Sequence, residues 1–260
     1  MGLVCKAVRK EEATIQTVSL SFFRFRSIAA RLWAFSQMGF AHSGLKTTPG
    51  VGFYKLCGTG TGEGFTPAPN TGVYTILATW PSLEHARDQV RNARSFKAFR
   101  DQSSENWTLF MAPTSARGKW AGVEPFKAPP RSSPPQTGPI AALTRARLKP
   151  SIMRQFWRRV PDISTAIGAD PNVAFKIGMG EAPLINQVTF SIWPNAASMA
   201  AFARADGPHA RAIKAVRDGA WFAEELYARF EILADEGAWT DPRWQGDRPL
   251  ARFNLTEAAA

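Results

Sequence analysis

Two stretches of the chain repeat one pattern of apolar and polar positions in the same order. The motif TWPS at residues 79–82 recurs as IWPN at residues 192–195, and each copy closes an apolar strand and opens a helix. Upstream, residues 51–53 with Lys55 recur as residues 173–175 with Lys176. Still earlier, Arg24, Ile28 and Trp33 have counterparts in Arg147, Ile152 and Trp157. Landmarks that keep their order at a near-constant offset predict a tandem duplication.

Each copy reads as strand, helix, strand, strand, helix, strand. Expected strands cover residues 17–24, 50–57, 72–80 and 107–111 in the first copy, and 140–148, 173–178, 187–193 and 227–233 in the second. This order is the ferredoxin-like βαββαβ unit. Such a sheet has helices on one face only, so the second copy is the natural cover for its other face. We therefore expect an α+β fold, with two antiparallel sheets packed as an intramolecular dimeric α/β barrel around an apolar pocket.

The helices and the domain bounds follow from the same reading. The first helix, near residues 27–42, has Ile28, Leu32, Phe35 and Gly39 on one face, and Ile152, Phe156 and Val160 form a similar stripe in the second copy. The expected units are a flexible extension (residues 1–14), the first repeat (15–112), a Pro-rich linker (113–138), the second repeat (139–234) and a C-terminal tail (235–260).

Charge and cysteine content narrow the class of protein. The net charge is +11, and acidic residues are missing between Glu12 and Glu63 and between Glu124 and Asp162. Such a basic field attracts nucleic acid, anionic lipid or an acidic protein. The expected third strands lack the RNP1 pattern of RNA-recognition modules, which argues against nucleic acid. Two cysteines and a polar start without an apolar signal region predict a cytoplasmic protein.

Sequence motifs for common enzyme chemistry are missing. The chain contains no HExxH, GxSxG or P-loop motif, and its glycine string at residues 58–64 gives no GxGxxG frame. Its three histidines offer no pair at metal-ligand spacing. His209 stands out because it follows a Gly-Pro helix start and shares a face with Ala212, Ile213 and Val216. Such a histidine is either a hydrogen-bonded core residue or an inward-facing ligand.

One inward imidazole beside a roomy apolar pocket suits a non-covalent haem b with a proximal histidine. Lys176 alternates with Val173, Phe175 and Ile177, so we expect it to face the barrel interior, and Arg145 and Arg147 to do likewise. These cations would pair with haem propionates or lie at a solvated edge.

Long and idiosyncratic segments lie at residues 30–38, 58–67, 70–74, 78–81, 113–118 and 221–230. They resemble the spheroidene monooxygenase family, the carotenoid 2-ketolases of purple phototrophic bacteria, and the resemblance runs from about Thr17 to Trp239. Residues 1–16 have no counterpart in it.

The resemblance implies a haem-dependent monooxygenase that introduces a C2 keto group into acyclic methoxy carotenoids, taking spheroidene to spheroidenone with O2 and reduced ferredoxin. With haem implied, the helix position of His209 makes it the expected proximal ligand, and Arg24, Lys176, Trp221 and Phe222 are expected to lie in the haem pocket; the catalytic residues stay unassigned. Because carotenoids reside in membranes, peripheral contact with the photosynthetic membrane is expected. The alternatives are another haem-binding or cofactor-free monooxygenase or peroxidase of this fold, or a non-catalytic carotenoid-binding protein.

Overall fold

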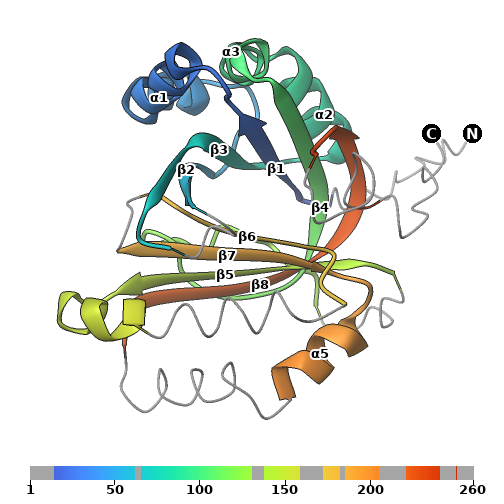
Figure 1. The fold of residues 1–260 in the computed structure, drawn as a ribbon. Helices are drawn as coiled ribbons and strands as arrows, with labels where there is room; N and C mark the ends of the chain where they lie inside the picture. Colours follow the sequence, from blue (N-terminus) through green and yellow to red (C-terminus); the bar gives the residue numbers. More distant parts are fainter. Residues whose placement is uncertain are drawn as a thin grey trace, which may run out of the picture.

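The computed structural model describes residues 15–61, 66–130, 138–158, 172–181, 185–204, 221–240 and 250 (Figure 1). Its elements are β1 (Thr17–Arg24), α1 (Ile28–Lys46), β2 (Tyr54–Gly60), β3 (Pro69–Trp80), α2 (Leu83–Asn92), α3 (Arg94–Gln102), β4 (Glu105–Gly118), β5 (Ile140–Leu148), the short 3-10 helix η1 (Pro150–Ile152), β6 (Phe175–Gly180), β7 (Asn186–Trp193), α5 (Ala196–Arg204) and β8 (Phe222–Gly237). Residues 153–158 are helical and continue from η1.

The strands close into one antiparallel barrel in the order β1-β3-β2-β6-β7-β5-β8-β4. The first half of the chain contributes the run β4-β1-β3-β2 and the second half the run β8-β5-β7-β6. A long pairing between β4 and β8 joins the halves on one side, from Trp107 opposite Gly237 to Gly118 opposite Leu226. On the other side β2 and β6 pair only at Gly58 with Gly180 and at Thr59 with Met179. The α+β class and the barrel are thus as expected.

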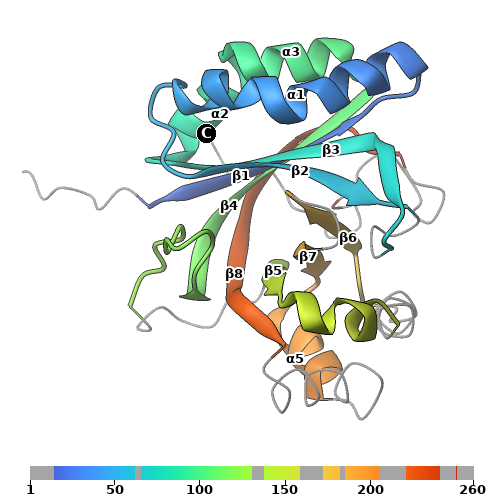
Figure 2. The same ribbon diagram turned by 90° about the vertical axis from the view of Figure 1, so that its left-hand side faces the viewer.

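Alternation along the strands sends side chains to two different cores. In β1, Val18, Leu20 and Phe22 point into the barrel, whereas Phe23 belongs to a second core under the helices. Helices α1, α2 and α3 cover the outer face of the first sheet, and α5 lies on the far side of the second sheet (Figure 2). The outer core includes Phe25, Ile76, Trp80, Phe96, Phe99 and Phe110.

Helix α1 packs against the first sheet through a different face from the apolar stripe that is visible in the sequence. Its buried residues are Ala34, Ala41 and Leu45. Ile28, Leu32 and Phe35, the stripe visible in the sequence, are 77%, 65% and 66% exposed. Trp33 and Met38 of α1 are partly buried against the same outer core.

Several strands extend past their expected ends. The prediction was correct to the residue for β1 and β5, but β4 continues to Gly118 and so includes residues 113–118 of the expected linker. Strand β8 begins at Phe222 and ends at Gly237, well beyond the predicted residues 227–233. Among the described helices, none combines the length and the hydropathy that crossing a bilayer requires.

Candidate functional site

Aromatic rings fill the barrel. Phe22, Trp107, Phe175 and Phe190 are each at most 1% exposed. The Phe22 ring lies 5.3 Å from Trp107 and 5.3 Å from Phe175, and Trp107 lies 5.1 Å from Phe175, measured between ring centroids. The expected ligand chamber inside the barrel is therefore wrong at this level. An eight-stranded barrel is just wide enough for its own side chains, and these rings take up that space.

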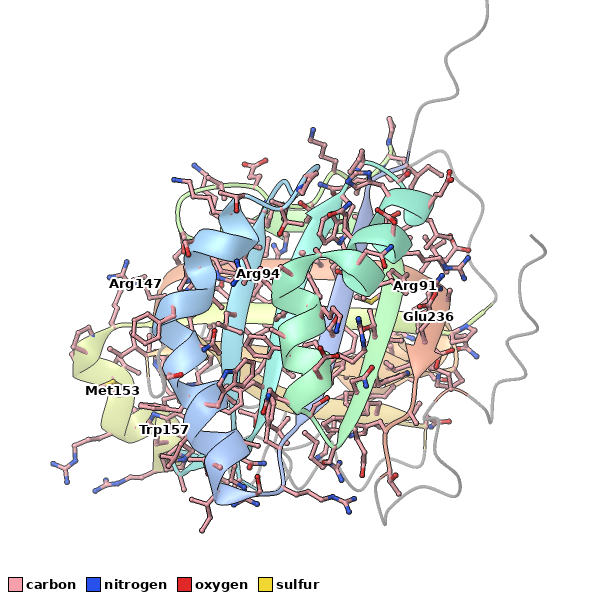
Figure 3. All side chains as sticks on the ribbon, turned by 90° about the horizontal axis from the view of Figure 1, so that it is seen from above. Arg91, Arg94, Arg147, Met153, Trp157 and Glu236 are labelled. Atoms are coloured by element: carbon pink, nitrogen blue, oxygen red, sulfur yellow. The ribbon has the colours of Figure 1, made fainter. Side chains whose placement is uncertain are left out.

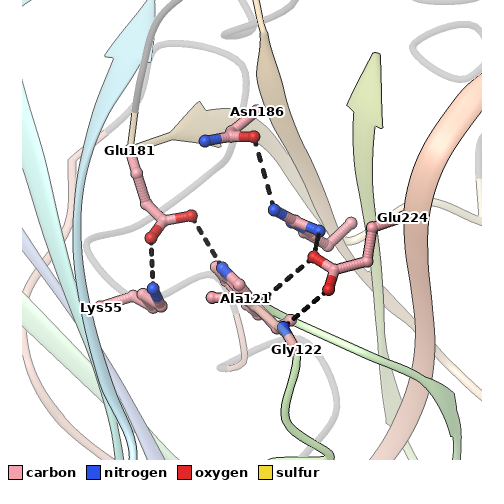
Figure 4. Close-up of polar contacts among 8 residues, drawn as sticks. Lys55, Ala121, Gly122, Glu181, Asn186 and Glu224 are labelled. Carbon is pink, nitrogen blue, oxygen red and sulfur yellow. Dashed lines mark hydrogen bonds and ion pairs between the residues drawn. The ribbon is translucent and has the colours of Figure 1, made fainter. Parts of the chain in front are cut away.

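A polar network closes one end of the barrel (Figure 4). Arg145 on β5 is 2% exposed and forms an ion pair with Glu224 on β8, and its Nη2 donates to Asn186 Oδ1 at 3.4 Å. The other partners of Glu224 are the backbone amides of Ala121 and Gly122, at 2.9 and 2.7 Å. Burial raises the pKa of Glu224, but these two amides and the Arg145 charge outweigh it and hold the pKa below its usual value.

A second ion pair lies in the same network and links the two halves of the chain. Lys55 Nζ on β2 lies 2.5 Å from Oε1 of Glu181, the residue that directly follows β6. Trp120 Nε1 donates to the other carboxylate oxygen of Glu181 at 2.8 Å. Nearby, Cys57 is 1% exposed, and burial, with the Glu181 charge, raises the pKa of its thiol far above the usual range. This end of the barrel holds two ion pairs and a protonated thiol, and the Arg145 Nε atom is buried there without a hydrogen-bond partner.

Arg24 lies at the opposite end of the barrel. It pairs in register with Glu105 at the start of β4, and its Nη1 lies 3.5 Å from a Glu105 carboxylate oxygen. Its guanidinium stacks on Trp239 at 4.3 Å, and Trp239 in turn contacts Phe22. Arg24 therefore already has two partners, Glu105 and Trp239, at this end of the barrel.

The outer face of the second sheet has smaller side chains than the first in one of its cross-strand rows. In the first sheet Ser19 pairs with Ala78, much as Ala142 pairs with Ser191 in the second. The next row contains Ser21, Ile76 and Leu56 in the first sheet, whereas Thr144 pairs with Thr189 in the second. Gly178 of β6 continues the Thr144 row. A sheet face with such short side chains leaves room for a flat group between the sheet and whatever covers it.

Lys176 belongs to this outer face, contrary to the expectation that it points into the barrel. Phe175 and Ile177 on either side of it are part of the barrel core, so alternation turns Lys176 outward, opposite Ser191. It is 4% exposed. The earlier match of Lys176 with Lys55 is also wrong. Lys55 lies on the same face of its strand as Phe53 and Cys57, which contact the barrel core, so it points inward whereas Lys176 points outward. Arg145 does point into the barrel, but Glu224 occupies its guanidinium.

The remaining expected pocket residues lie elsewhere or outside the described part of the chain. Trp221 is 5% exposed, and its carbonyl accepts from Lys149 N at 3.1 Å. Phe222 pairs with Leu148 at the end of β5, whereas Lys176 shares a row with Ala142 near its start. The structure therefore does not bring Arg24, Lys176 and Trp221 together. His209 lies outside the described residues. Among the residues that are described, no group of three His, Cys, Asp or Glu side chains could hold a metal ion.

An open hollow of about 360 Å³ lies where β5 gives way to η1 and residues 153–158. It is lined by Pro67, Met153, Arg154, Trp157 and Arg158. Its polar side chains are basic, and its remaining walls are apolar. Sequence analysis missed this site, although Met153 and Trp157 flank the stripe of the second copy.

Comparison with known proteins decides the family. The chain is 49% identical to a spheroidene monooxygenase of Rhodobacter capsulatus over 242 residues, which is 93% of this chain and 98% of the relative. The chain belongs to the spheroidene monooxygenase family. A family member from Cereibacter sphaeroides is 48% identical over 92% of this chain and 73% of its own, and one from Rubrivivax gelatinosus is 33% identical over 83% and 82%. No protein-family model matches.

Membership of the spheroidene monooxygenase family confirms the expected resemblance, and with it the expectation of an oxygenating oxidoreductase. Two solved aldoxime dehydratase structures share the fold. They have TM-scores of 0.56 and 0.55, identities of 9% and 12%, and cover 85% and 86% of this chain and 81% and 83% of their own. At such low identity this likeness concerns only the arrangement of strands and helices.

Proposed function

We propose that this protein is a carotenoid monooxygenase that oxidises C2 of acyclic 1-methoxy carotenoids, converting spheroidene to spheroidenone. The observation that carries the proposal is the 49% identity to a spheroidene monooxygenase over almost the full length of both chains. Each oxidation consumes one O2, two electrons and two protons, places one oxygen atom on C2 and releases one water. Two such rounds give a geminal diol, which loses water to become the ketone. Reduced ferredoxin is the proposed electron donor.

Haem b is the proposed cofactor, because side chains alone do not oxidise an unactivated C–H bond. When bound, haem supplies the activation of dioxygen. The outer face of the second sheet is its proposed place, because Thr144, Thr189 and Gly178 form a row of short side chains there and Lys176 adds a buried cation in the same area. His209 would bind the haem iron through its imidazole, and Lys176 would pair with a propionate.

The proposed site therefore lies on the outer side of the second sheet and not inside the barrel. The filled barrel acts as a rigid support, since strands hold side chains in place more precisely than loops. Trp221 and Phe222 come from the start of β8, at the end of this face, and we propose that they border the bound carotenoid. Arg24 stays with Glu105 and Trp239 at the barrel mouth, where it closes the support.

The equal strand order in the two halves supports an origin by tandem duplication of a ferredoxin-like unit. The runs β4-β1-β3-β2 and β8-β5-β7-β6 correspond strand by strand. Trp80 and Trp193 end corresponding strands, and they pair with Thr17 and Ile140 at the starts of β1 and β5. In this proposal the first copy has Ile76 and Leu56 under its helices, while the second has Thr189 and Gly178 at the corresponding positions and became the binding unit.

The test is turnover by the purified protein. Spheroidene, O2 and reduced ferredoxin should give spheroidenone, detected by its shifted absorption spectrum and by mass, with label from ¹⁸O2 in the keto group when back-exchange is controlled. The resting protein should show a Soret band. A colourless, iron-free protein that still ketolates spheroidene would remove the haem from the proposal. A haem protein that binds spheroidene without oxidising it would indicate a carrier.

A further inference from the structure

The outward side of α1 carries a row of large apolar side chains that nothing in the described chain covers. Ile28, Leu32, Phe35 and Phe40 are between 65% and 77% exposed. Trp33 packs on Phe99 of α3, with ring centroids 5.3 Å apart. Helical spacing puts Ile28, Leu32 and Phe35 on the side of α1 away from α3. We call these three residues the α1 stripe. Contiguous exposed apolar residues of this kind mark an interaction surface.

The surroundings of the α1 stripe are basic. Helix α1 contains no Asp or Glu, and Arg31 and Lys46 on it are exposed. Within the described residues, neither of these two cations forms an ion pair with an acidic side chain. Large apolar side chains flanked by unpaired cations are the pattern of helices that lie in the interface of an anionic bilayer.

The hollow at Met153 and Trp157 lies on the same side of the molecule as α1. Both segments appear on the left in Figure 1 and in Figure 3. The hollow combines an apolar lining with Arg154 and Arg158, which are exposed. One side of the protein therefore presents two apolar areas, each with its own cations. A second copy of this chain would place like charges against like, whereas anionic lipid headgroups complement both areas at once.

We propose that the α1 stripe and the hollow at residues 153–158 together dock the protein on the surface of an anionic lipid bilayer. Apolar side chains enter the interface and arginines and lysines bind headgroup phosphates. The docking itself follows from the exposed residues; its use, the uptake of a carotenoid from the bilayer, rests on the proposed function.

The experiment is sedimentation of the full-length protein with vesicles that contain no carotenoid. Vesicles of phosphatidylcholine with phosphatidylglycerol should bind the protein, and pure phosphatidylcholine at least tenfold more weakly. The L32E/F35E variant should lose about tenfold or more of its affinity for the mixed vesicles. The R154Q/R158Q variant should lose about tenfold, and added salt should weaken vesicle binding further. Val123→Glu is the matched control, because Val123 is also exposed, at 49%, but lies outside the surface.

Circular dichroism and the thermal midpoint of each variant verify that the fold is kept, as expected for exposed positions. Equal vesicle binding by the wild type and L32E/F35E would overturn the proposal. So would a wild-type dimer that L32E/F35E converts to a monomer, because the α1 stripe would then belong to a second copy. The assay involves no turnover, so its failure and the failure of the proposed function are separate results. L32E/F35E should still oxidise carotenoid presented in detergent.

Discussion

Phe22 of β1 and Phe175 of β6 meet edge to face inside the barrel, with ring centroids 5.3 Å apart. The two strands are not neighbours in the barrel order, and they come from different halves of the chain. Each ring is at most 1% exposed. The barrel core is thus shared between the halves, and neither half contains a complete interior of its own.

Removal of either ring should destabilise the whole chain in one step. Phe22→Ala and Phe175→Ala should each lower the free energy of unfolding by about 3–5 kcal/mol, through lost burial and the cavity left behind. The double variant should show a coupling of about 0.5–1.5 kcal/mol beyond additivity. Urea unfolding followed by fluorescence and circular dichroism measures both. Phe35→Ala, at an exposed position, is the control and should be nearly neutral; two separate transitions in the wild type would contradict the shared core.

Glu224 should make the protein sensitive to acid. Glu224→Gln leaves the buried Arg145 without its counter-charge, and loss of one partner of such a pair costs about 3 kcal/mol of unfolding free energy. The native pKa of Glu224 lies below its ordinary value of 4.5. Its stabilising contribution is therefore complete above pH 4.5 and is lost as the pH falls through the lower native pKa.

The measurement for Glu224 is the unfolding free energy from pH 7 down to pH 3. The gap between the wild type and Glu224→Gln should narrow as the solution becomes acidic. Glu225→Gln is the matched control, because Glu225 is exposed and on the opposite face of β8. A gap that stays constant down to pH 3 would show that the Glu224 charge does not stabilise the fold.

Cys57 should resist alkylation in the native protein. Its thiol is buried, and burial together with the Glu181 charge raises its pKa, so little of the reactive thiolate forms. In a Cys5→Ser background, iodoacetamide at pH 8 should modify Cys57 at least a hundredfold more slowly than it modifies the unfolded chain. Ser115→Cys, at an exposed position of β4, should react at an ordinary rate. Rapid modification of Cys57 would mean that this end of the barrel is open.

The small-residue face of the second sheet can be filled by mutation. Thr144→Phe should prevent haem incorporation, and so should His209→Ala, in each case seen as loss of the Soret band with circular dichroism unchanged. Ser115→Phe adds a ring to an exposed strand position outside this face and should keep the Soret band. In the reduced, carbon monoxide-treated protein the band should be that of an imidazole-ligated haem. Full haem content in Thr144→Phe would exclude this face as the binding site.

Strand positions could be predicted well because alternation is a strong local signal. The bounds of β1 and β5 were predicted to the residue. Alternation also separates Lys176 from Phe175 and Ile177, but it does not tell which side faces the barrel. Both faces of this strand are buried, so the pattern is symmetric, and only the closure of the barrel decides the direction of Lys176.

Helix burial was harder to predict because size and burial disagree in α1. Ile28, Leu32 and Phe35 give the stronger stripe by hydrophobicity, whereas Ala34, Ala41 and Leu45 are the residues that become buried. The packing inside the barrel was equally hard to predict: the sequence shows that aromatic residues are plentiful, but not that Phe22, Trp107 and Phe175 contact one another there. The small residues Ala142, Thr144 and Ser191 were visible in the sequence, and their meaning emerged only when the register placed them beside one another.

The two junctions between the halves differ greatly in length, and this gives the barrel an order of opening. A run of backbone pairs holds β4 to β8, whereas β2 and β6 share only the pairs Gly58 with Gly180 and Thr59 with Met179. Thermal fluctuations should break the shorter junction first and leave the longer one as a hinge. Cys57 adjoins the shorter junction, so the rate at which its thiol is alkylated would report how often the two halves separate there.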